Sequence, residues 1–402
     1  MKAGWEMKRL GDVCQTGSGG TPLKSKREYY DGGIIPWLLS GEVGQGEVLE
    51  TKNFISKKGL ENSSAKIFPV NTVLVAMYGA TAGQVGILRF EAATNQAICG
   101  IFPHKCFVPE FLFYFFLSEK DELVAQAAGN AQPNISQFKI KNTFVPVSPL
   151  PEQQRIVALL DEAFTAIATA RANAEKNLKN ARALFDTYLN AVFSQRGDGW
   201  VENKLVSLTS KIGSGATPRG GGESYKMEGT SLIRSLNVHD PGFRYSKLAF
   251  LDDGQADGLS NVIVQPGDVL LNITGASVAR CCIVPDDVLP ARVNQHVSII
   301  RPIPSKLDSD FLHYLLISKC YKDQLLQTGA EGGATRQAIT KAQIQDFTVR
   351  YPADRGGQQS IVSKLDALRK ETQHLESIYQ KKIEALDVLK KSILHQAFNG
   401  EL

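Results

Sequence analysis

The sequence predicts a mixed α/β (α+β) fold in which two similar domains alternate with two long helices that pair as an antiparallel coiled coil, a pseudo-two-fold internal repeat. Trp5 and Trp200 each begin a stretch that runs to a Gly-Ser-Gly-x-Thr-Pro loop ending at Pro22 or Pro218. The offset is 195 for the tryptophans and 196 for the loops, and the two helical patterns that follow the domains keep an offset of 205. The repeat therefore predicts four segments: a domain at 1–150, a helix at 151–197, a domain at 198–352 and a helix at 353–402.

Each predicted domain contains short apolar runs bounded by glycine-rich turns, the pattern of β-strands. In the first domain these runs are residues 71–78 and 83–88, and residues 268–274 of the second domain match the first of them. Residues 110–117 are apolar enough to be buried, and their second copy, 310–317, continues with a helical pattern. We therefore expect a helix at this position in both domains.

The two long segments carry apolar side chains at alternating steps of four and three, which is the seam of a coiled coil. Pro149 and Pro151 precede the first helix, and Gly197 and Gly199 follow it, so the expected breakers mark both ends. Each helix of roughly 40 residues would be about 60 Å long. The predicted seams are Ile156, Leu160, Ala163, Ile167, Ala170, Ala174, Asn177, Ala181, Leu184 and Tyr188, and Ile361, Leu365, Leu368, Thr372, Leu375, Tyr379, Lys382, Leu386, Leu389 and Ile393.

The two helices are expected to pair with each other, because two equivalent domain–helix units related by a two-fold axis run their helices in opposite directions. The alternative is that each helix packs on its own domain. An apolar stripe of about six heptads is longer than one small domain can cover, which favours pairing. The offset stays at 205 through the helices but drifts from 195 to 205 across the domains, which indicates a fixed spacer carrying two different sets of loops.

The composition is that of ordinary globular domains, with 43% hydrophobic and 21% charged residues. The net charge is +4, and both domains are close to neutral: residues 1–150 carry 15 basic and 13 acidic side chains, and residues 200–352 carry 16 and 15. A surface for nucleic acid must therefore come from local clustering of basic side chains. No apolar run reaches the roughly 18 residues of a membrane span. The six cysteines form no Cys-x-x-Cys pair, which argues against a zinc site or a disulfide framework. We expect a cytoplasmic protein without membrane contact.

No credible active site emerges from the sequence. The glycine loops resemble phosphate-binding loops, but Thr-Pro follows where such a motif would open a helix, so a turn between a strand and a loop is the better interpretation. Asp31 with Glu50 and Lys52 is a loose set of the nuclease kind, and nothing near Lys247 matches it in the second copy. The six histidines do not pair at metal-ligand spacing. We therefore expect no catalytic residue and no metal site in this chain.

Residues suited to DNA contact fall at matched places in the two copies. A chain with two similar faces fits a ligand with two similar sites, and duplex DNA is the leading candidate. The loops after the Thr-Pro pairs offer basic and aromatic residues, and the paired Asn-Gln motifs supply amides that match an adenine edge. Each residue taken singly is equally well explained as a solvated loop residue or a cap. The candidate contacts are Thr21, Lys24, Lys26, Arg27, Tyr29, Asn95, Gln96, Gln132 and Asn134 in the first copy and Thr217, Arg219, Lys226, Arg234, Asn294, Gln295, Arg336 and Gln337 in the second.

Longer motifs also recur along the chain. The openings Trp5–Asp12 and Trp200–Ser207 correspond, and so do the Thr-Pro loops and the Asn-Gln motifs. The most specific elements are Pro149–Val157, which reads Pro-Leu-Pro-Glu-Gln-Gln-Arg-Ile-Val, and the C-terminal Ser392–Leu402. With these motifs the whole chain resembles the DNA-specificity (S) subunit of type I restriction-modification enzymes.

The resemblance implies two target recognition domains that each read one half of a split DNA sequence, with the coiled coil fixing the separation of the half-sites. It also implies a non-catalytic subunit that binds no cofactor itself. Two modification (methyltransferase) subunits dock on such a chain, and restriction/translocase subunits complete the assembly; S-adenosylmethionine and ATP/Mg are expected on those partners. Two positions depart from the repeat, since Arg234 stands where the first copy has Leu39 and the second helix begins at Ala353 without a proline-rich segment.

Two other functions are compatible with the sequence: a structural coiled-coil adaptor and a self-sufficient DNA-modifying enzyme. Pure protein that cut or methylated DNA without partners would establish the enzyme. A complex without salt-sensitive DNA affinity would support the adaptor.

Overall fold

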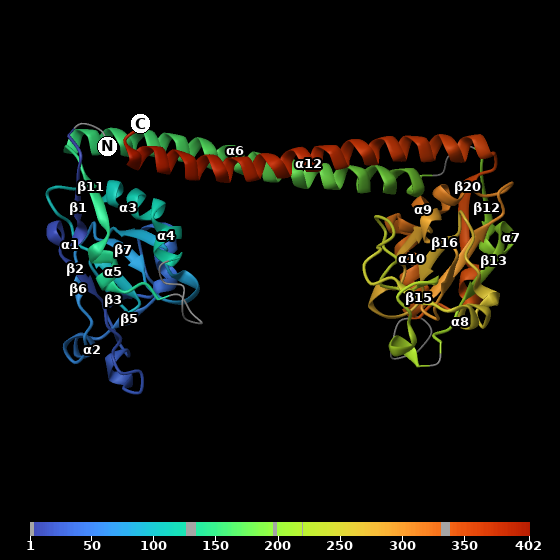
Figure 1. The fold of residues 1–402 in the computed structure, drawn as a ribbon, viewed down its shortest axis with the longest axis horizontal. Helices are drawn as coiled ribbons and strands as arrows, with labels where there is room; N and C mark the ends of the chain where they lie inside the picture. Colours follow the sequence, from blue (N-terminus) through green and yellow to red (C-terminus); the bar gives the residue numbers. More distant parts are fainter. Residues whose placement is uncertain (1–3, 126–133, 196–198, 219, 331–337) are drawn as a thin grey trace. The chain divides into compact units, whose positions relative to one another are not determined.

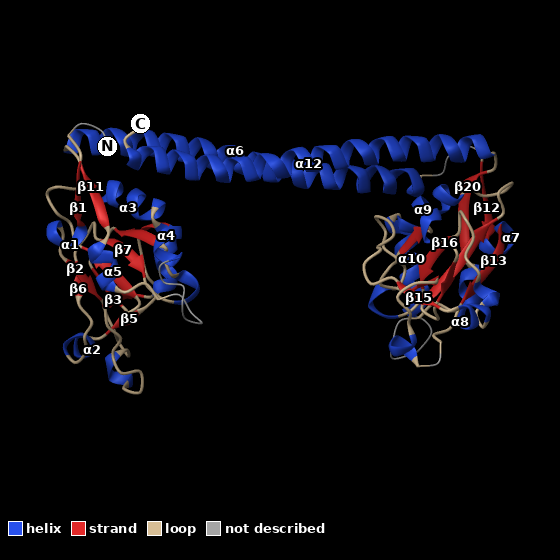
Figure 2. Cartoon of the chain, in the orientation of Figure 1, coloured by secondary structure: helices blue, strands red, loops and turns tan. Residues whose placement is uncertain are grey.

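The chain folds as two compact units, each with one mixed α/β domain and one segment from each of the long helices α6 (Leu150–Ser194) and α12 (Arg355–Asn399) (Figures 1 and 2). Unit 1 consists of Met1–Glu175 with Lys381–Leu402, and unit 2 of Lys176–Gln380. The predicted fold class is confirmed. The computed structural model describes residues 4–125, 134–195, 199–218, 220–330 and 338–402.

The strands of unit 1 are β1 (Glu6–Arg9), β2 (Thr16–Ser18), β3 (Ile35–Leu38), β4 (Gly46–Val48), β5 (Phe54–Ile55), β6 (Ile67–Phe68), β7 (Val73–Ala76), β8 (Val85–Leu88), β9 (Ala92–Thr94), β10 (Ile98–Ile101) and β11 (Phe144–Val147). Its helices besides the long ones are α1 (Leu10–Val13), α2 (Lys57–Glu61), α3 (Pro109–Ser118), α4 (Lys120–Ala125) and α5 (Gln137–Asn142), with 3-10 turns η1 (Arg27–Tyr29), η2 (Ser40–Gln45) and η3 (Gly79–Thr81). Within the described residues, β1 pairs with β11, and two sheets have the orders β2-β10-β7-β8-β4 and β5-β3-β9-β6.

The strands of unit 2 are β12 (Trp200–Lys204), β13 (Thr209–Ser214), β14 (Thr230–Ile233), β15 (Ala249–Leu251), β16 (Val269–Asn272), β17 (Cys281–Ile283), β18 (Ala291–Val293), β19 (Val297–Pro302) and β20 (Thr348–Pro352). Its shorter helices are α7 (Leu205–Leu208), α8 (Asp253–Asp257), α9 (Ser309–Ile317), α10 (Lys319–Ala330) and α11 (Lys341–Asp346), with 3-10 turns η4 (Gly221–Ser224), η5 (Ser260–Val262), η6 (Gly275–Ser277) and η7 (Asp286–Val288). In the described part of this unit, β12 pairs with β20, and the sheets have the orders β13-β19-β16-β17 and β15-β14-β18.

The strand pairing repeats between the units, as the duplicated sequence predicts. Strand β10 lies antiparallel between β2 and β7, and β19 lies antiparallel between β13 and β16. Strand β3 runs parallel to β9, and β14 runs parallel to β18. The strands expected within 71–78, 83–88 and 268–274 are β7, β8 and β16, and the buried helix expected at 110–117 is α3. These predictions are confirmed.

The core of each unit is closed by the last turns of one long helix. In unit 1, Phe111 of α3 packs between Phe398 of α12 and the opening tryptophan, with ring centroids 5.2 and 6.2 Å away. In unit 2, Phe311 of α9 packs between Phe193 of α6 and the second opening tryptophan, at 5.4 and 5.9 Å. The first domain is therefore completed by the end of the second helix, and the second domain by the end of the first.

The two long helices run antiparallel within unit 1. Lys390 of α12 lies over the ring of Phe164 on α6, with 4.8 Å between its Nζ and the ring centroid. Further along α6, Arg171 forms an ion pair with Asp387, which lies earlier in α12. The residue numbers rise along α6 while those of the partners on α12 fall, so the helices point in opposite directions.

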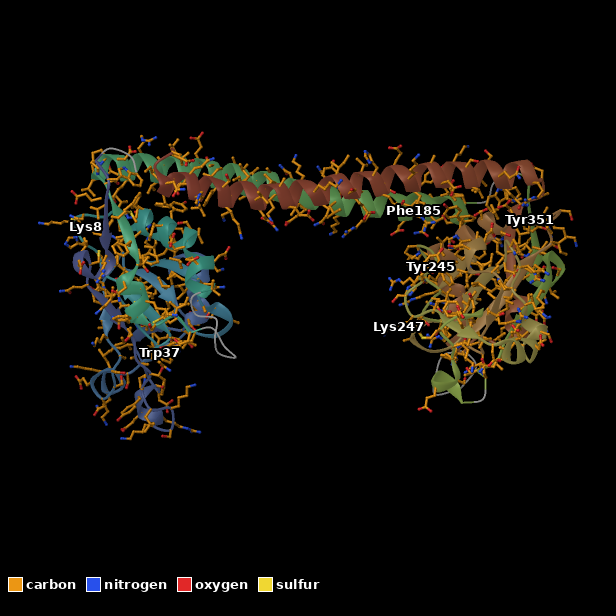
Figure 3. All side chains as sticks on the ribbon, in the orientation of Figure 1. Lys8, Trp37, Phe185, Tyr245, Lys247 and Tyr351 are labelled. Carbon is orange, nitrogen blue, oxygen red and sulfur yellow. The ribbon has the colours of Figure 1, made fainter. Side chains whose placement is uncertain are left out.

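Unit 2 repeats this pairing with the other segments of the same helices. Arg182 of α6 forms an ion pair with Glu376 of α12 at 3.0 Å, and Phe185 meets the guanidinium of Arg369 at 5.5 Å (Phe185 is labelled in Figure 3). Arg369 also lies 5.7 Å from the ring of Tyr314 in the domain. Each helix segment thus contacts both the other helix and a domain. Pairing of the helices and packing on a domain, which the sequence analysis treated as alternatives, therefore occur together.

The buried stripe of α6 departs from the predicted seam in the second half of the helix. Leu178 and Leu189 are buried, whereas Leu184 and Tyr188 are 48% and 39% exposed and Asn177 is exposed. The prediction used a strict repeat of 3.5 residues, but a straight α-helix has 3.6 residues per turn and its stripe drifts away from such a repeat. Packing against α9 in unit 2 also selects the side chains that the domain covers.

The seam of α12 needs a similar correction. Ile383 is buried where the sequence placed Lys382, which is exposed, and Leu389 is 46% exposed. Leu394 is buried one position after the predicted Ile393, in the core of unit 1. The same drift explains the shift, because it grows with distance from the start of the pattern.

His313 on α9 is buried in unit 2, and within the described residues its Nε2 has no hydrogen-bond partner. The pKa of His313 is lowered from its ordinary 6.5 to about 4; burial is the largest cause, the charge of Arg369 adds to it, and the charge of Asp240 opposes the shift. The unfolded chain therefore takes up this proton at a higher pH than the folded unit does. The contribution of neutral His313 is complete above pH 6.5 and is lost as the pH falls from 6.5 to about 4, by about 3 kcal/mol.

Replacing His313 by phenylalanine is expected to flatten this part of the pH dependence. Phenylalanine stands at the matched position of α3, Phe113, so the apolar ring suits the site. Urea unfolding at pH 7 and pH 4.5, followed by hydrogen exchange of unit 2 peptides, measures the change. An equal loss of stability in both proteins over this range would contradict the assignment.

Candidate nucleic-acid interface

Four segments that are distant in sequence meet beside the end of β7 in unit 1. Gly20, after β2, donates its N–H to the carbonyl of Thr94 at 2.8 Å. Met77 donates its N–H to the carbonyl of Ala97 at 2.7 Å, and its own carbonyl accepts the N–H of Ile135 at 2.9 Å. We call these segments, residues 17–22, 77–82, 94–97 and 134–135, loop cluster 1.

Unit 2 joins the corresponding segments beside the end of β16; the two bonds of Ile273 match those of Met77, whereas the bond from the Thr-Pro loop is shifted by one residue on each side. Gly215 donates its N–H to the carbonyl of Asn294 at 3.1 Å. Ile273 donates to the carbonyl of His296 at 3.0 Å and accepts from Ile339 at 2.8 Å. We call residues 213–218, 273–278, 293–296 and 338–339 loop cluster 2. The hydrogen bonds hold the same parts of each domain together, although the loops differ in length.

The glycines of the Thr-Pro loops permit this close approach. A Cβ atom on Gly19 would lie 2.2 Å from the carbonyl oxygen of Thr94, and one on Gly215 would lie 1.8 Å from that of Val293. No other residue fits these positions without moving the backbone. The loops follow β2 and β13, in agreement with the prediction of a turn after a strand. The glycines allow the loops to lie against the neighbouring turn.

The same approach joins the two motifs that the sequence analysis singled out. The hydroxyl of Thr21 donates to Oε1 of Gln96, and the hydroxyl of Thr217 donates to Oε1 of Gln295. The partners are 75 and 78 positions apart in the chain. Both glutamines are exposed, so each cluster presents an amide that a threonine holds.

Side chains from the rest of the domain hold the loop of cluster 1. The indole N–H of Trp37 (labelled in Figure 3) donates to the carbonyl of Gly20 at 3.0 Å. The hydroxyl of Tyr30 donates to the carbonyl of Pro22 at 2.5 Å. The loop therefore presents its polar groups from a fixed backbone.

The basic segment after this loop exposes three cations, Lys24, Lys26 and Arg27. Lys26 donates to the hydroxyl of Tyr29 at 3.2 Å, and this hydrogen bond raises the pKa of Lys26, which keeps the amine charged. Tyr29 itself is only 6% exposed, because its ring packs into unit 1. Tyr29 therefore has little surface to offer for the DNA contact predicted for it, whereas the three cations are exposed and can reach a phosphate.

Of the cations that the sequence selected in the second copy, Lys226 and Arg234 lie within the described residues, and both make contacts inside unit 2. The guanidinium of Arg234 lies 5.1 Å from the ring centroid of Tyr225 and donates to the carbonyl of Lys247 at 2.5 Å. Figure 3 labels Lys247 at the surface of this unit. Lys226 forms an ion pair with Asp252 at 3.2 Å, with both side chains 48% exposed. Arg234 thus has a structural role, which accounts for its lack of a counterpart at Leu39.

The asparagines of the paired motifs shape the turns. Asn294 is 4% exposed, and its Oδ1 accepts the N–H of His296 at 3.0 Å. Asn95 is half-buried, and its Oδ1 accepts the N–H of Ala97 at 3.2 Å. Asn294 therefore offers no amide to a base in this structure; the exposed member of each motif is the glutamine.

Of the remaining candidates, Asn134 belongs to the last segment of loop cluster 1, and the others lie outside the described residues. Asn134 is exposed and forms an isolated β-bridge with Tyr78. Gln132, Arg219, Arg336 and Gln337 lie outside the described residues and stay predictions.

Two side chains of cluster 2 were not selected from the sequence. Nε2 of His296 lies 3.1 Å from Nε2 of Gln295, and Nδ1 of His296 lies 2.6 Å from the hydroxyl of Thr274. Unit 1 has Ala97 and Tyr78 at the matched positions. The aligned copies differ at the residue before the turn at Gly79 or Gly275 and at the residue after the Asn-Gln pair. Comparing the copies at these positions would have found both side chains.

Three further properties of the described residues concern metal-ligand groups, cysteine thiols and membrane spans. No group of three or more His, Cys, Asp or Glu among them is placed to hold a metal ion. Burial raises the pKa of Cys14, Cys99 and Cys282 to about 12, so these groups remain thiols at neutral pH. None of the helices in the described part of the chain has the length and apolar character needed to cross a membrane.

Residues 2–179 and 229–385 match the type I restriction modification DNA specificity domain. These matches cover more than half of the chain, which therefore belongs to this family. It is 25% identical over 194 residues to the EcoR124I/EcoR124II specificity subunit of Escherichia coli, covering 47% of this chain and 48% of that one. It is 21% identical over 417 residues to the MjaVIII specificity subunit of Methanocaldococcus jannaschii, covering 99% and 93%.

The extent of the match varies among these curated relatives. The chain spans about half the length of the first of them, with 48% of the EcoR124I/EcoR124II subunit and 57% of the MjaIX specificity subunit of M. jannaschii covered. Among solved structures, a chain of a type I R-M system matches with a TM-score of 0.78 and 23% identity, covering 100% of this chain and 99% of that one. The HsdS subunit from Thermoanaerobacter tengcongensis matches with a TM-score of 0.68 and 22% identity, covering 100% and 98%. These similarities show that the fold is shared.

Proposed function

We propose that this chain is the sequence-specific DNA-binding subunit of a type I restriction-modification complex, and that loop clusters 1 and 2 each read one half of a bipartite DNA site. One observation carries the proposal: in both clusters backbone hydrogen bonds join corresponding segments and the same Thr–Gln pair is present, but the side chains around them differ. A repeated scaffold with altered surroundings suits two different half-sites on one duplex. Helices α6 and α12 act as the spacer between them.

The chemistry in this proposal belongs to partner subunits. Two modification (methyltransferase) subunits, which bind S-adenosylmethionine, dock on the helices, and restriction/translocase subunits that use ATP and Mg complete the assembly in the cytoplasm. The family membership supports this, and so does the internal repeat, because a chain with two similar units offers two similar surfaces to two copies of one partner. The subunit itself is non-catalytic.

Replacing Lys24, Lys26 and Arg27 together by alanine is expected to weaken DNA binding by the assembled complex and to reduce its salt dependence. Each lost phosphate contact lowers the slope of log K against log salt by about 0.9, so the slope falls by about 2–3. Base preference in the half-site read by cluster 2 is unchanged, because those residues are untouched. Fluorescence anisotropy at several salt concentrations measures both effects, on the site found by mapping methylated adenines in cells.

The matched control replaces three exposed lysines that belong neither to a cluster nor to the basic segment 24–27, namely Lys8, Lys105 and Lys204. An equal loss in the control would assign the effect to general charge. A footprint with a single contiguous core would overturn the bipartite proposal. DNA affinity that does not respond to salt would favour the adaptor, and cleavage or methylation by the pure chain would favour the enzyme.

A further inference from the structure

We infer that Gln96 and Gln295 each read one A·T pair, one in each half-site, and that Thr21 and Thr217 are the positioning residues that hold their amides. This inference rests on the proposed function and adds to it the class of base edge recognised. It also assigns base contact to the glutamine of each Asn-Gln motif and not to the asparagine, whereas the sequence analysis selected both as candidates.

The hydrogen-bond inventory of the held amide selects the base. A glutamine amide has two N–H donors and one oxygen with two lone pairs, and the threonine hydroxyl uses one lone pair. A donor and an acceptor remain on the exposed amide, and the same holds if the amide is turned over so that an N–H meets the hydroxyl oxygen. In the major groove, adenine presents an acceptor and a donor side by side, whereas guanine presents two acceptors. The held amide therefore matches adenine and meets guanine acceptor to acceptor.

The position of the pair in both clusters argues against a purely structural role. Gln96 and Gln295 are exposed, and a surface hydrogen bond of this kind adds little stability. The neighbouring side chains differ between the units, and the loops differ in length, yet the pair is kept. An unrestrained glutamine loses rotamer entropy when it is fixed against a base. The hydrogen bond from threonine restrains the side chain before DNA binds, so less entropy is lost on binding.

Unit 2 holds its amide at both ends. Nε2 of Gln295 meets Nε2 of His296 at 3.1 Å, where the imidazole nitrogen acts as the acceptor. The other ring nitrogen then carries the proton and donates to the hydroxyl of Thr274 at 2.6 Å. One N–H and one lone pair are left on Gln295, which is the pattern for a bidentate contact with adenine. Gln96 has Ala97 in place of the histidine, so we expect stricter discrimination by unit 2.

The test uses the assembled complex and duplexes that carry its mapped site. Each A·T pair of a half-site is replaced in turn by G·C, or its adenine by 7-deazaadenine, which lacks the N7 acceptor. For the wild-type complex we expect one position in each half-site where either change weakens binding by about 5- to 100-fold. Thr217→Val is expected to reduce this discrimination about 3- to 10-fold in the half-site of unit 2 alone, and Thr217→Ser is expected to retain it.

Two further variants complete the design. His296→Ala gives unit 2 the residue that unit 1 has, and we expect it to lower discrimination in unit 2 to the level of unit 1. Gln295→Met changes an exposed side chain, so the fold is kept, and we expect it to abolish the preference for adenine at that position. Hydrogen exchange of unit 2 peptides checks that each variant is folded.

The outcomes separate this inference from the proposed function. If no position in either half-site responds to 7-deazaadenine, or if Gln295→Met discriminates as the wild type does, the reading role of the glutamines is wrong. Equal discrimination by Thr217→Val and wild type would remove the positioning role of threonine. A wild-type complex without salt-sensitive, bipartite DNA binding would instead refute the proposed function itself.

Discussion

Replacing Gln153 by alanine is expected to destabilise unit 1 by about 3–5 kcal/mol, because three backbone groups lose their partner and each costs about 1–3 kcal/mol when buried unpaired. Gln153 is fully buried near the start of α6. Its Oε1 accepts the N–H of Val108 at 2.9 Å, and its Nε2 donates to the carbonyls of Cys106 and Ser148, both at 2.8 Å. The side chain thereby ties the segment before α3 and the end of β11 to the long helix.

Gln358 makes the same contacts in unit 2, so Gln358→Ala is expected to destabilise that unit to a similar extent. Its Oε1 accepts the N–H of Asp308 at 2.8 Å, and its Nε2 donates to the carbonyls of Lys306 and Pro352, both at 3.0 Å. An amide is required at this place, because no other neutral side chain of this length supplies both donors and an acceptor. The first glutamine of each repeated Gln-Gln pair is thus a structural element of the helix start.

The neighbouring glutamines provide matched controls for both variants. Gln154 and Gln359 are exposed, and their replacement by alanine is expected to change the free energy of unfolding by less than about 0.5 kcal/mol. Urea unfolding with peptide-resolved hydrogen exchange assigns each loss to its unit. A similar effect for the buried and the exposed glutamine of a pair would show that the buried contacts are not the cause.

Replacing Arg301 by phenylalanine is expected to destabilise unit 2 by about 3–5 kcal/mol, because it leaves a buried carboxylate without its partner. Asp268 is fully buried, and Arg301 binds it with Nε and Nη2 at 2.7 and 2.8 Å. The carboxylate also accepts the N–H of Gln265 at 2.8 Å. That single remaining hydrogen bond cannot replace a bidentate guanidinium.

Unit 1 supplies the matching double variant. The strand registers place Val73 opposite Ile101 and Val269 opposite Ile300, so Thr72 and Phe102 occupy the positions of Asp268 and Arg301. We expect Asp268→Thr with Arg301→Phe to cost about 2 kcal/mol less than Arg301→Phe alone, since the unpaired charge is gone. Chemical unfolding of the four proteins of this cycle measures the coupling. Additive effects would mean that the ion pair contributes nothing beyond its separate side chains.

The fold was predictable because apolar runs bounded by glycine-rich turns recur in the second copy, and this pattern does not depend on loop length. The strands and helices expected in this way are present as β7, β8, β16, α3 and α9. The seam was less predictable. The predicted seam positions Ile156 and Leu160 are buried, but at Leu178 the buried position has moved one residue past the predicted one. A heptad repeat extrapolated over a long helix accumulates the difference between 3.5 and 3.6 residues per turn.

The candidate site was predictable as a set of loops and less so as individual side chains. Composition and recurrence selected Thr21 and Gln96, but their contact spans 75 positions and depends on the path of two loops. Burial separated Gln295 from Asn294, although both are amides in the same turn. Arg234 has the chemistry of a DNA contact, and a neighbouring aromatic ring that the sequence does not place beside it gives it a structural role.

The closure of the first domain by the end of α12 has a consequence for biosynthesis. Leu394, Ala397 and Phe398 belong to the core of unit 1, whereas unit 2 consists of residues 176–380. At about 5–20 residues per second, a ribosome needs roughly 10–40 s to travel from the end of the first segment of unit 1 to the start of the second. The domain made first is thus the last to be finished, and a nascent chain holds a whole unit 2 while unit 1 still lacks its cover. A prematurely released polypeptide would contain unit 2 and an unclosed unit 1, and under the proposed function we expect it to bind the bipartite site less tightly than the full chain.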